Sequence, residues 1–115
     1  MTVRSVSEQP EIVLVNWGVM QDFSGYRLVG MHITPRGSQS GRVSSAIVEF
    51  DDHAMTVRTE SGRLYHLSGS PNEKVSAALI RAHIRRWGLT VTDVAMAEPR
   101  EVALALAPKP RGGLN

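Results

Sequence analysis

The alternation of hydrophobic and polar positions predicts short β-strands through the first two thirds of the chain. Residues 11–19 are rich in β-branched and aromatic side chains, and residues 26–34 continue this pattern after a turn-forming segment at 22–25. We expect these two segments to form a hairpin. A third strand is predicted at residues 45–50. Its alternating positions place three apolar side chains on one face: Ala46, Val48 and Phe50.

A second hairpin is predicted at residues 55–67. A three-residue loop at 60–62 pairs Val57 with Tyr65 and keeps the matching positions of the two strands on common faces. It also places Gly62 where a type I turn with a G1 bulge needs a left-handed residue. A two-residue loop would mix the two faces, so the three-residue loop is the prediction.

One helix is expected at about residues 71–87. Ser70, Pro71 and Glu73 form the pattern of a capping box, with Ser70 as the N-cap, and Gly88 supplies the C-terminal stop. The helix is apolar over more than half of its circumference, so it is predicted to lie across the sheet and to have contacts on both flanks. The predicted fold is α+β, with five to six short antiparallel strands in a curled sheet or small barrel, covered by this one helix.

The chain is expected to hold one domain, at residues 11–96, because 115 residues are too few for two ordinary domains. Residues 1–10 are interpreted as a frayed leader. A last strand is predicted at residues 89–95, and residues 97–115 as a largely disordered tail. Within that tail, residues 102–106 fit either a short edge strand or a helical turn.

Composition excludes several classes of protein. The chain has no cysteine, which rules out disulfides, thiolate zinc sites and thiol nucleophiles. Its apolar runs are shorter than the roughly 18 residues that a membrane span needs, so no membrane partner is expected. The first residues lack the apolar segment of a secretory signal, which predicts a cytoplasmic protein.

No residue pattern indicates catalysis, a metal ion or a cofactor. The four histidines (His32, His53, His66 and His83) do not share the spacing of a metal site on a helix. Asp51 and Asp52, the adjacent carboxylate pair, sit in a predicted turn, where Asp is common. Nucleophile-elbow and phosphate-loop motifs do not occur. The chain is therefore predicted not to be an enzyme.

The best candidate for a binding surface is a basic stripe on the predicted helix. Its members are Lys74, Arg81 and Arg85, which lie within about 40° of one another, together with the neighbouring Arg86. Such a stripe fits contacts with phosphates or carboxylates, and it equally fits the solvated face of an amphipathic helix.

The second candidate surface is the Gly/Ser-rich segment 35–44. It lacks periodicity and is predicted to be a surface loop with Arg36 and Arg42 flanking its tip. A loop of this kind either presents a recognition surface or serves as a plain connector.

The middle of the chain resembles small uncharacterised proteins carried on plasmids and prophages of Gram-negative bacteria. The resemblance covers residues 26–71 and rests on YRLVG at 26–30, GR at 41–42, SSAIV at 44–48, Asp51 and TESGRLYHLSG at 59–69. It implies a mobile-element setting. Small non-enzymatic domains in that setting often inhibit host defence, as anti-CRISPR proteins do, or regulate the element.

Three interpretations follow from the sequence. The first is a non-enzymatic protein-binding module, an inhibitor or adaptor, whose spare apolar helix surface also suits a homodimer. The second is a nucleic-acid-binding accessory or regulatory protein that uses the basic helix stripe, since residues 71–115 carry a net charge of +3. The third is a stable domain of unclassified role, which includes an enzyme with an unrecognised site.

Overall fold

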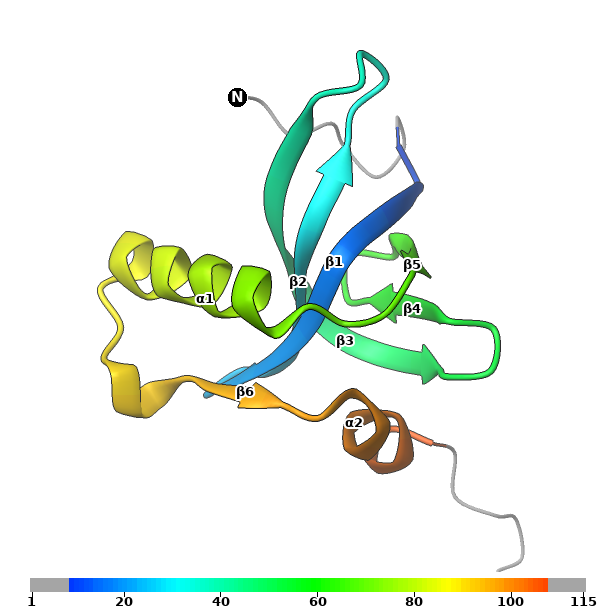
Figure 1. Cartoon of the computed structure of the whole chain (residues 1–115). Coiled ribbons are helices and arrows are strands. Elements are labelled where there is room, and N and C mark those ends of the chain that lie inside the picture. Colours follow the sequence, from blue (N-terminus) through cyan, green and yellow to red (C-terminus); the bar gives the residue numbers. More distant parts are fainter. Residues whose placement is uncertain (1–8, 108–115) are drawn as a thin grey trace, which may run out of the picture.

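Five strands close into a small barrel in the computed structural model, which describes residues 9–107 (Figure 1). A sixth strand and two helices lie outside the barrel wall. The elements in chain order are β1 (Glu11–Asp22), β2 (Gly25–Ile33), β3 (Gln39–Asp51), β4 (Thr56–Thr59), β5 (Leu64–Ser68), α1 (Glu73–Trp87), a 3₁₀-helix (Val91–Asp93), β6 (Ala95–Ala97) and α2 (Pro99–Ala105).

The barrel closes because each of its strands pairs with the next and β5 returns to β1. Consecutive strands are antiparallel, whereas β1 and β5 are parallel. The parallel pair follows from the odd number of strands, since the first and fifth members of an alternating series run the same way. β6 extends the sheet by pairing with the second half of β1. The predicted small α+β barrel is confirmed, with mixed rather than purely antiparallel pairing.

Two apolar clusters hold the elements together. The larger one fills the barrel, and α2 contributes Val102 and Ala103 to it. Trp17 lies in this cluster and donates from Nε1 to the Gly69 carbonyl at 3.0 Å. The smaller cluster lies between α1 and the outer side of the barrel, and its buried members are Met20, Val29, Ile80 and Val94.

The predicted β4–β5 hairpin is confirmed in its register. Val57 pairs with Tyr65, and the Thr59 N–H donates to the Arg63 carbonyl at 3.2 Å, which leaves a three-residue loop at 60–62. Gly62 has φ +91°, and its N–H donates to the Thr59 carbonyl at 2.8 Å. These features match the G1-bulge loop, because a left-handed residue suits glycine.

β3 is longer and less regular than the predicted strand at 45–50. It begins at Gln39, so the expected loop at 35–44 shrinks to a turn near residues 34–38. A register shift lies between Ile47 and Glu49. Because a bulge changes which face the following side chains occupy, Val48 is exposed and does not share a buried face with Ala46 and Phe50.

The helix α1 begins two residues later than the capping-box pattern predicts. Its N-cap is Asn72, whose side chain accepts from the Val75 N–H at 3.0 Å, whereas Ser70 is exposed. Gly88 ends the helix in the left-handed conformation, as predicted. The helix packs on β1, β2 and β3 and also contacts β6. Ser76 and Ile80 are its buried residues, whereas Trp87 on the predicted apolar side is exposed.

The segment after α1 differs most from the prediction. Residues 89–95 contain a 3₁₀-helix rather than a strand, and the short β6 follows at Ala95–Ala97. α2 (Pro99–Ala105) lies within the segment predicted as a largely disordered tail, so that prediction is wrong for these residues. Of the two alternatives for residues 102–106, the helical one is observed. Most of the predicted leader and residues 108–115 fall outside the described range. In the described part of the chain, no helix has the length and apolar character needed to cross a membrane.

Candidate functional site

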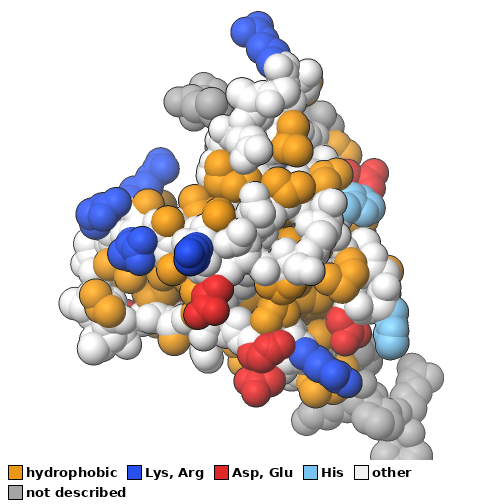
Figure 2. Space-filling model, in the orientation of Figure 1, with side chains coloured by type: hydrophobic (Ala, Val, Ile, Leu, Met, Phe, Trp, Pro, Cys, Tyr) orange, Lys and Arg blue, Asp and Glu red, His pale blue; other side chains and the backbone are white. Residues whose placement is uncertain are grey.

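The predicted basic stripe lies on the outward side of α1. Lys74, Arg81, Arg85 and Arg86 are all exposed, and Figure 2 shows basic side chains gathered over this helix. Within residues 9–107, none of the four forms an ion pair. We call these four side chains the basic face. Unpaired exposed cations remain available to carboxylates or phosphates of a partner.

An exposed tryptophan lies at the C-terminal end of the basic face. Trp87 lies one helical turn after the half-buried His83, and the centres of the two rings are 6.4 Å apart. At the last turn of the helix this side chain is 64% exposed. Tryptophan next to arginines is a composition enriched at the centres of protein interfaces.

The other two predicted site residues lie apart from each other. Arg36 is exposed in the turn after β2, whereas Arg42 is half-buried within β3. Leu79 of α1 lies 2.6 Å from where a Cβ on Gly41 would be, so Gly41 faces the helix and Arg42 faces the opposite side. Arg42 is near His32, and burial together with the charges of Arg42 and Arg63 lowers the pKa of His32. The structure therefore does not unite Arg36 and Arg42 into one loop surface.

A buried ionic network lies beneath α1, and no sequence motif predicted it. The Asp22 side chain is 2% exposed and accepts from the Ser24 N–H (2.8 Å), the Ser24 hydroxyl (2.5 Å) and Arg27 Nε (3.1 Å). Burial opposes ionisation of Asp22, but these hydrogen bonds and the Arg27 charge outweigh it, so the pKa of Asp22 is lowered. His83 Nε2 lies 3.8 Å from the same carboxylate.

This network stabilises the fold, because its hydrogen bonds hold the β1–β2 turn in place. The Ser24 hydroxyl donates to Asp22 rather than to His83, so it does not form the nucleophile–base contact of a hydrolase. Arg27 also donates to the Ser44 carbonyl at 3.0 Å, which ties the β1–β2 turn to β3. Burial and the Arg27 charge lower the pKa of His83 despite the opposing effect of Asp22. Among residues 9–107, no three metal-binding side chains lie close enough to hold an ion.

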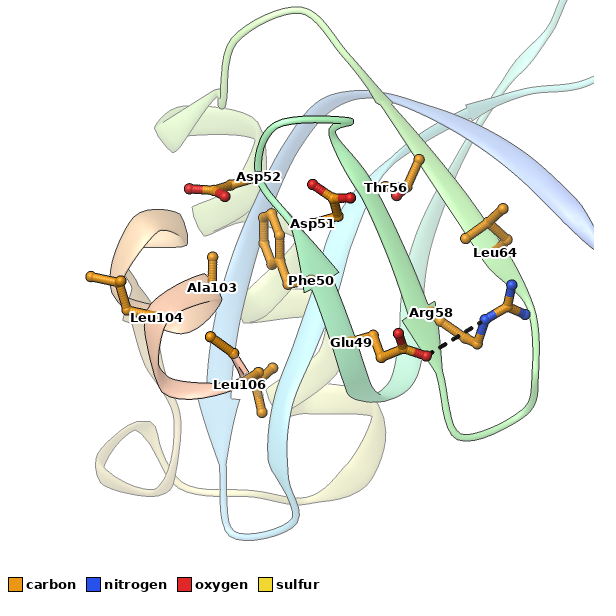
Figure 3. A pocket seen from close by; sticks show the side chains of 11 residues that line it. Glu49, Phe50, Asp51, Asp52, Thr56, Arg58, Leu64, Ala103, Leu104 and Leu106 are labelled. Atoms are coloured by element: carbon orange, nitrogen blue, oxygen red, sulfur yellow. Dashed lines mark ion pairs between the residues drawn. The ribbon is translucent and has the colours of Figure 1, made fainter. Parts of the chain in front are cut away.

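A groove lies between α2 and the outer side of β3 and β4 (Figure 3). Its volume is about 570 Å³. Three acidic side chains line it, Glu49, Asp51 and Asp52, with Arg58 lying 4.0 Å from Glu49. The apolar lining residues are Phe50, Leu64, Ala103, Leu104, Leu106 and Ala107. We call this feature the acidic groove. Sequence reasoning missed it because α2, one of its walls, was expected to be part of a tail.

Comparisons with known proteins do not identify the chain. No protein-family model, curated protein or solved structure matches it.

Proposed function

We propose that this chain is a non-enzymatic protein-binding module that uses the basic face and Trp87 to cover an acidic surface of a partner protein. The observation that carries the proposal is the exposed Trp87 beside Arg85 and Arg86 at the C-terminal end of α1. Inhibition or adaptor function by surface occlusion needs only such a surface on a rigid scaffold. The mobile-element setting that the sequence resemblance implies is part of the same proposal.

The charge distribution favours a protein over a nucleic acid. The basic face supplies four cations, and nucleic-acid affinity grows with the number of phosphates that a protein neutralises. The formal net charge of the whole chain is only +2. The acidic groove adds a surface that would repel phosphates. A protein partner with a local acidic patch requires no excess positive charge on the rest of the molecule.

The test is affinity capture from host lysate with the tagged protein, with and without nuclease. Arg81→Ala/Arg85→Ala and Trp87→Ala are compared with Arg36→Ala/Arg100→Ala, which removes the same charge from exposed sites outside α1. We expect a stoichiometric protein partner that survives nuclease, is lost with the α1 variants and is retained by the control.

Two other outcomes would change the assignment. Partners that disappear with nuclease, together with a steep salt dependence reduced by Arg81→Ala/Arg85→Ala, would indicate nucleic-acid binding through the same face. If the partner were lost only with the Arg36→Ala/Arg100→Ala control, α1 would not be part of the binding surface.

A further inference from the structure

We propose that the acidic groove receives the α1 end of a second copy of this chain, which gives a head-to-tail self-association. This inference rests on the proposed function, because it uses the basic face and Trp87 as the inserting surface. A second copy is the partner proposed here because the positive end of α1 and the negative groove are complementary in charge.

The groove combines apolar side chains with carboxylates, a chemistry that suits an apolar side chain flanked by cations. Its volume of about 570 Å³ lies in the range of ligand-binding clefts, and the labelled side chains in Figure 3 show α2 leucines on one side and the acidic β3 end on the other. Leu104 is 71% exposed, so one wall offers apolar area that the fold leaves uncovered. The three acids outnumber the single arginine at the rim.

Asp51 is held within its own turn, whereas Glu49 is open to solvent. Asp51 Oδ1 accepts from the backbone N–H groups of His53 and Ala54, each at 3.0 Å, and these hydrogen bonds hold the pKa of Asp51 below its usual value. Glu49 is 75% exposed and 4.0 Å from Arg58, too distant and too solvated for a strong ion pair. Glu49 and Asp52 are therefore available to cations of another molecule.

The inserting surface has the complementary composition. Arg85, Arg86 and Trp87 occupy the last turn of α1, where Trp87 is exposed. In Figure 1, α1 extends to the left of the barrel, whereas β4 forms part of the right-hand side of the barrel and α2 lies below it. α1 is fixed against β1, β2 and β3 in its own copy, so it cannot fill its own groove. The contact must then be intermolecular.

A contact between two different surfaces does not close on itself after two copies. Each added copy presents a free groove at one end and a free α1 at the other, which leads to open chains or rings rather than a symmetric dimer. Because exposed charges contribute to it, the association should weaken as salt screens them.

Sedimentation velocity over a range of concentrations, at low and high salt, tests the inference. The α1-deficient variant is Arg85→Ala/Trp87→Ala, and the groove-deficient variant is Glu49→Gln/Asp52→Asn, which keeps Asp51 because that residue shapes the turn. The control is Arg36→Ala/Glu60→Gln, at exposed positions outside α1 that do not line the groove. We expect the wild type and the control to form larger species with concentration, and each deficient variant to associate at least about tenfold more weakly.

Mixing the two deficient variants provides the decisive measurement. Each retains the surface that the other lacks, so an equimolar mixture should form a 1:1 heterodimer and no larger species. Formation of that heterodimer also shows that both variants are folded. A monomeric wild type, or a groove-deficient variant that still self-associates, would overturn the inference. If the wild type is monomeric but the α1 variants still lose the captured partner, the self-association fails and the proposed function stands.

Discussion

At the scale of single residues, the hydroxyl of Ser76 is a buried polar group without a hydrogen-bond partner among the described residues. Ser76 is 1% exposed and faces Gly18, where an added Cβ would lie 2.1 Å from its Oγ. A buried unsatisfied hydroxyl costs stability, and alanine is the better helix former. We therefore expect Ser76→Ala to raise the free energy of unfolding by about 1 kcal/mol. Urea unfolding measures this, and a loss of stability would contradict it.

His83 predicts how stability depends on pH. Its folded-state pKa is lowered from 6.5 by burial and by Arg27, so the unfolded chain takes up a proton at higher pH than the folded chain does. Stability should therefore fall as pH drops below about 6.5. Asp22, whose pKa is lowered from 3.8, adds a further loss only below about pH 3.8.

The measurement is the free energy of urea unfolding from pH 7.5 to 5. His83→Gln should flatten part of the decline, and the half-buried His32, whose pKa is also lowered, should account for much of the remainder. His53→Gln, at an exposed turn position, serves as the control. An unchanged slope in His83→Gln would show that His83 titrates alike in both states.

At the scale of elements, the start of α1 shows how tertiary contacts choose between two sequence signals. Both Ser70 and Asn72 are good N-cap residues. Asn72 becomes the cap because its backbone N–H donates to the Trp17 carbonyl at 2.8 Å and its side-chain amide lies 3.4 Å from Asn16 Oδ1, which fixes it to β1. Sequence reasoning had no access to these contacts with β1.

The two caps make opposite predictions for alanine substitutions. Asn72→Ala should lower the free energy of unfolding by about 1 kcal/mol, because the Val75 N–H loses its acceptor. Ser70→Ala should change it by less than about 0.5 kcal/mol, since Ser70 is exposed. Thermal or urea unfolding of both variants decides the matter. If Ser70→Ala lowered the free energy of unfolding more than Asn72→Ala does, Ser70 would be the N-cap, as the sequence predicts.

Elements defined by local chemistry were predictable, and those defined by distant contacts were not. The β4–β5 hairpin follows from alternation and the glycine of its turn, all within residues 55–67. The start of β3 looked like a loop because of its glycine and serine content. Gly41 lies there for a different reason: the Leu79 side chain of α1 needs the space of its Cβ. Nothing near Gly41 in the sequence indicates that requirement.

At the scale of the whole molecule, closure of the barrel creates the surfaces that the sequence leaves separate. The basic face was predictable because one helix carries all of it. The acidic groove combines β3, β4 and α2, whose contributions are separated by some fifty residues and meet only after closure. The basic face on α1 and the acidic groove at β3, β4 and α2 thus belong to different elements of a scaffold with a small net charge.

The role of α2 in this arrangement gives a final prediction. Val102 is 1% exposed and belongs to the barrel cluster, whereas Leu104 on the same helix is 71% exposed and lines the groove. Val102→Ala should lower the free energy of unfolding by about 2 kcal/mol through lost burial and the cavity it leaves. Leu104→Ala should leave it nearly unchanged while weakening self-association. If both variants lost the same stability, Leu104 would also pack in the core. α2 would then not present one face to the core and the other to the groove.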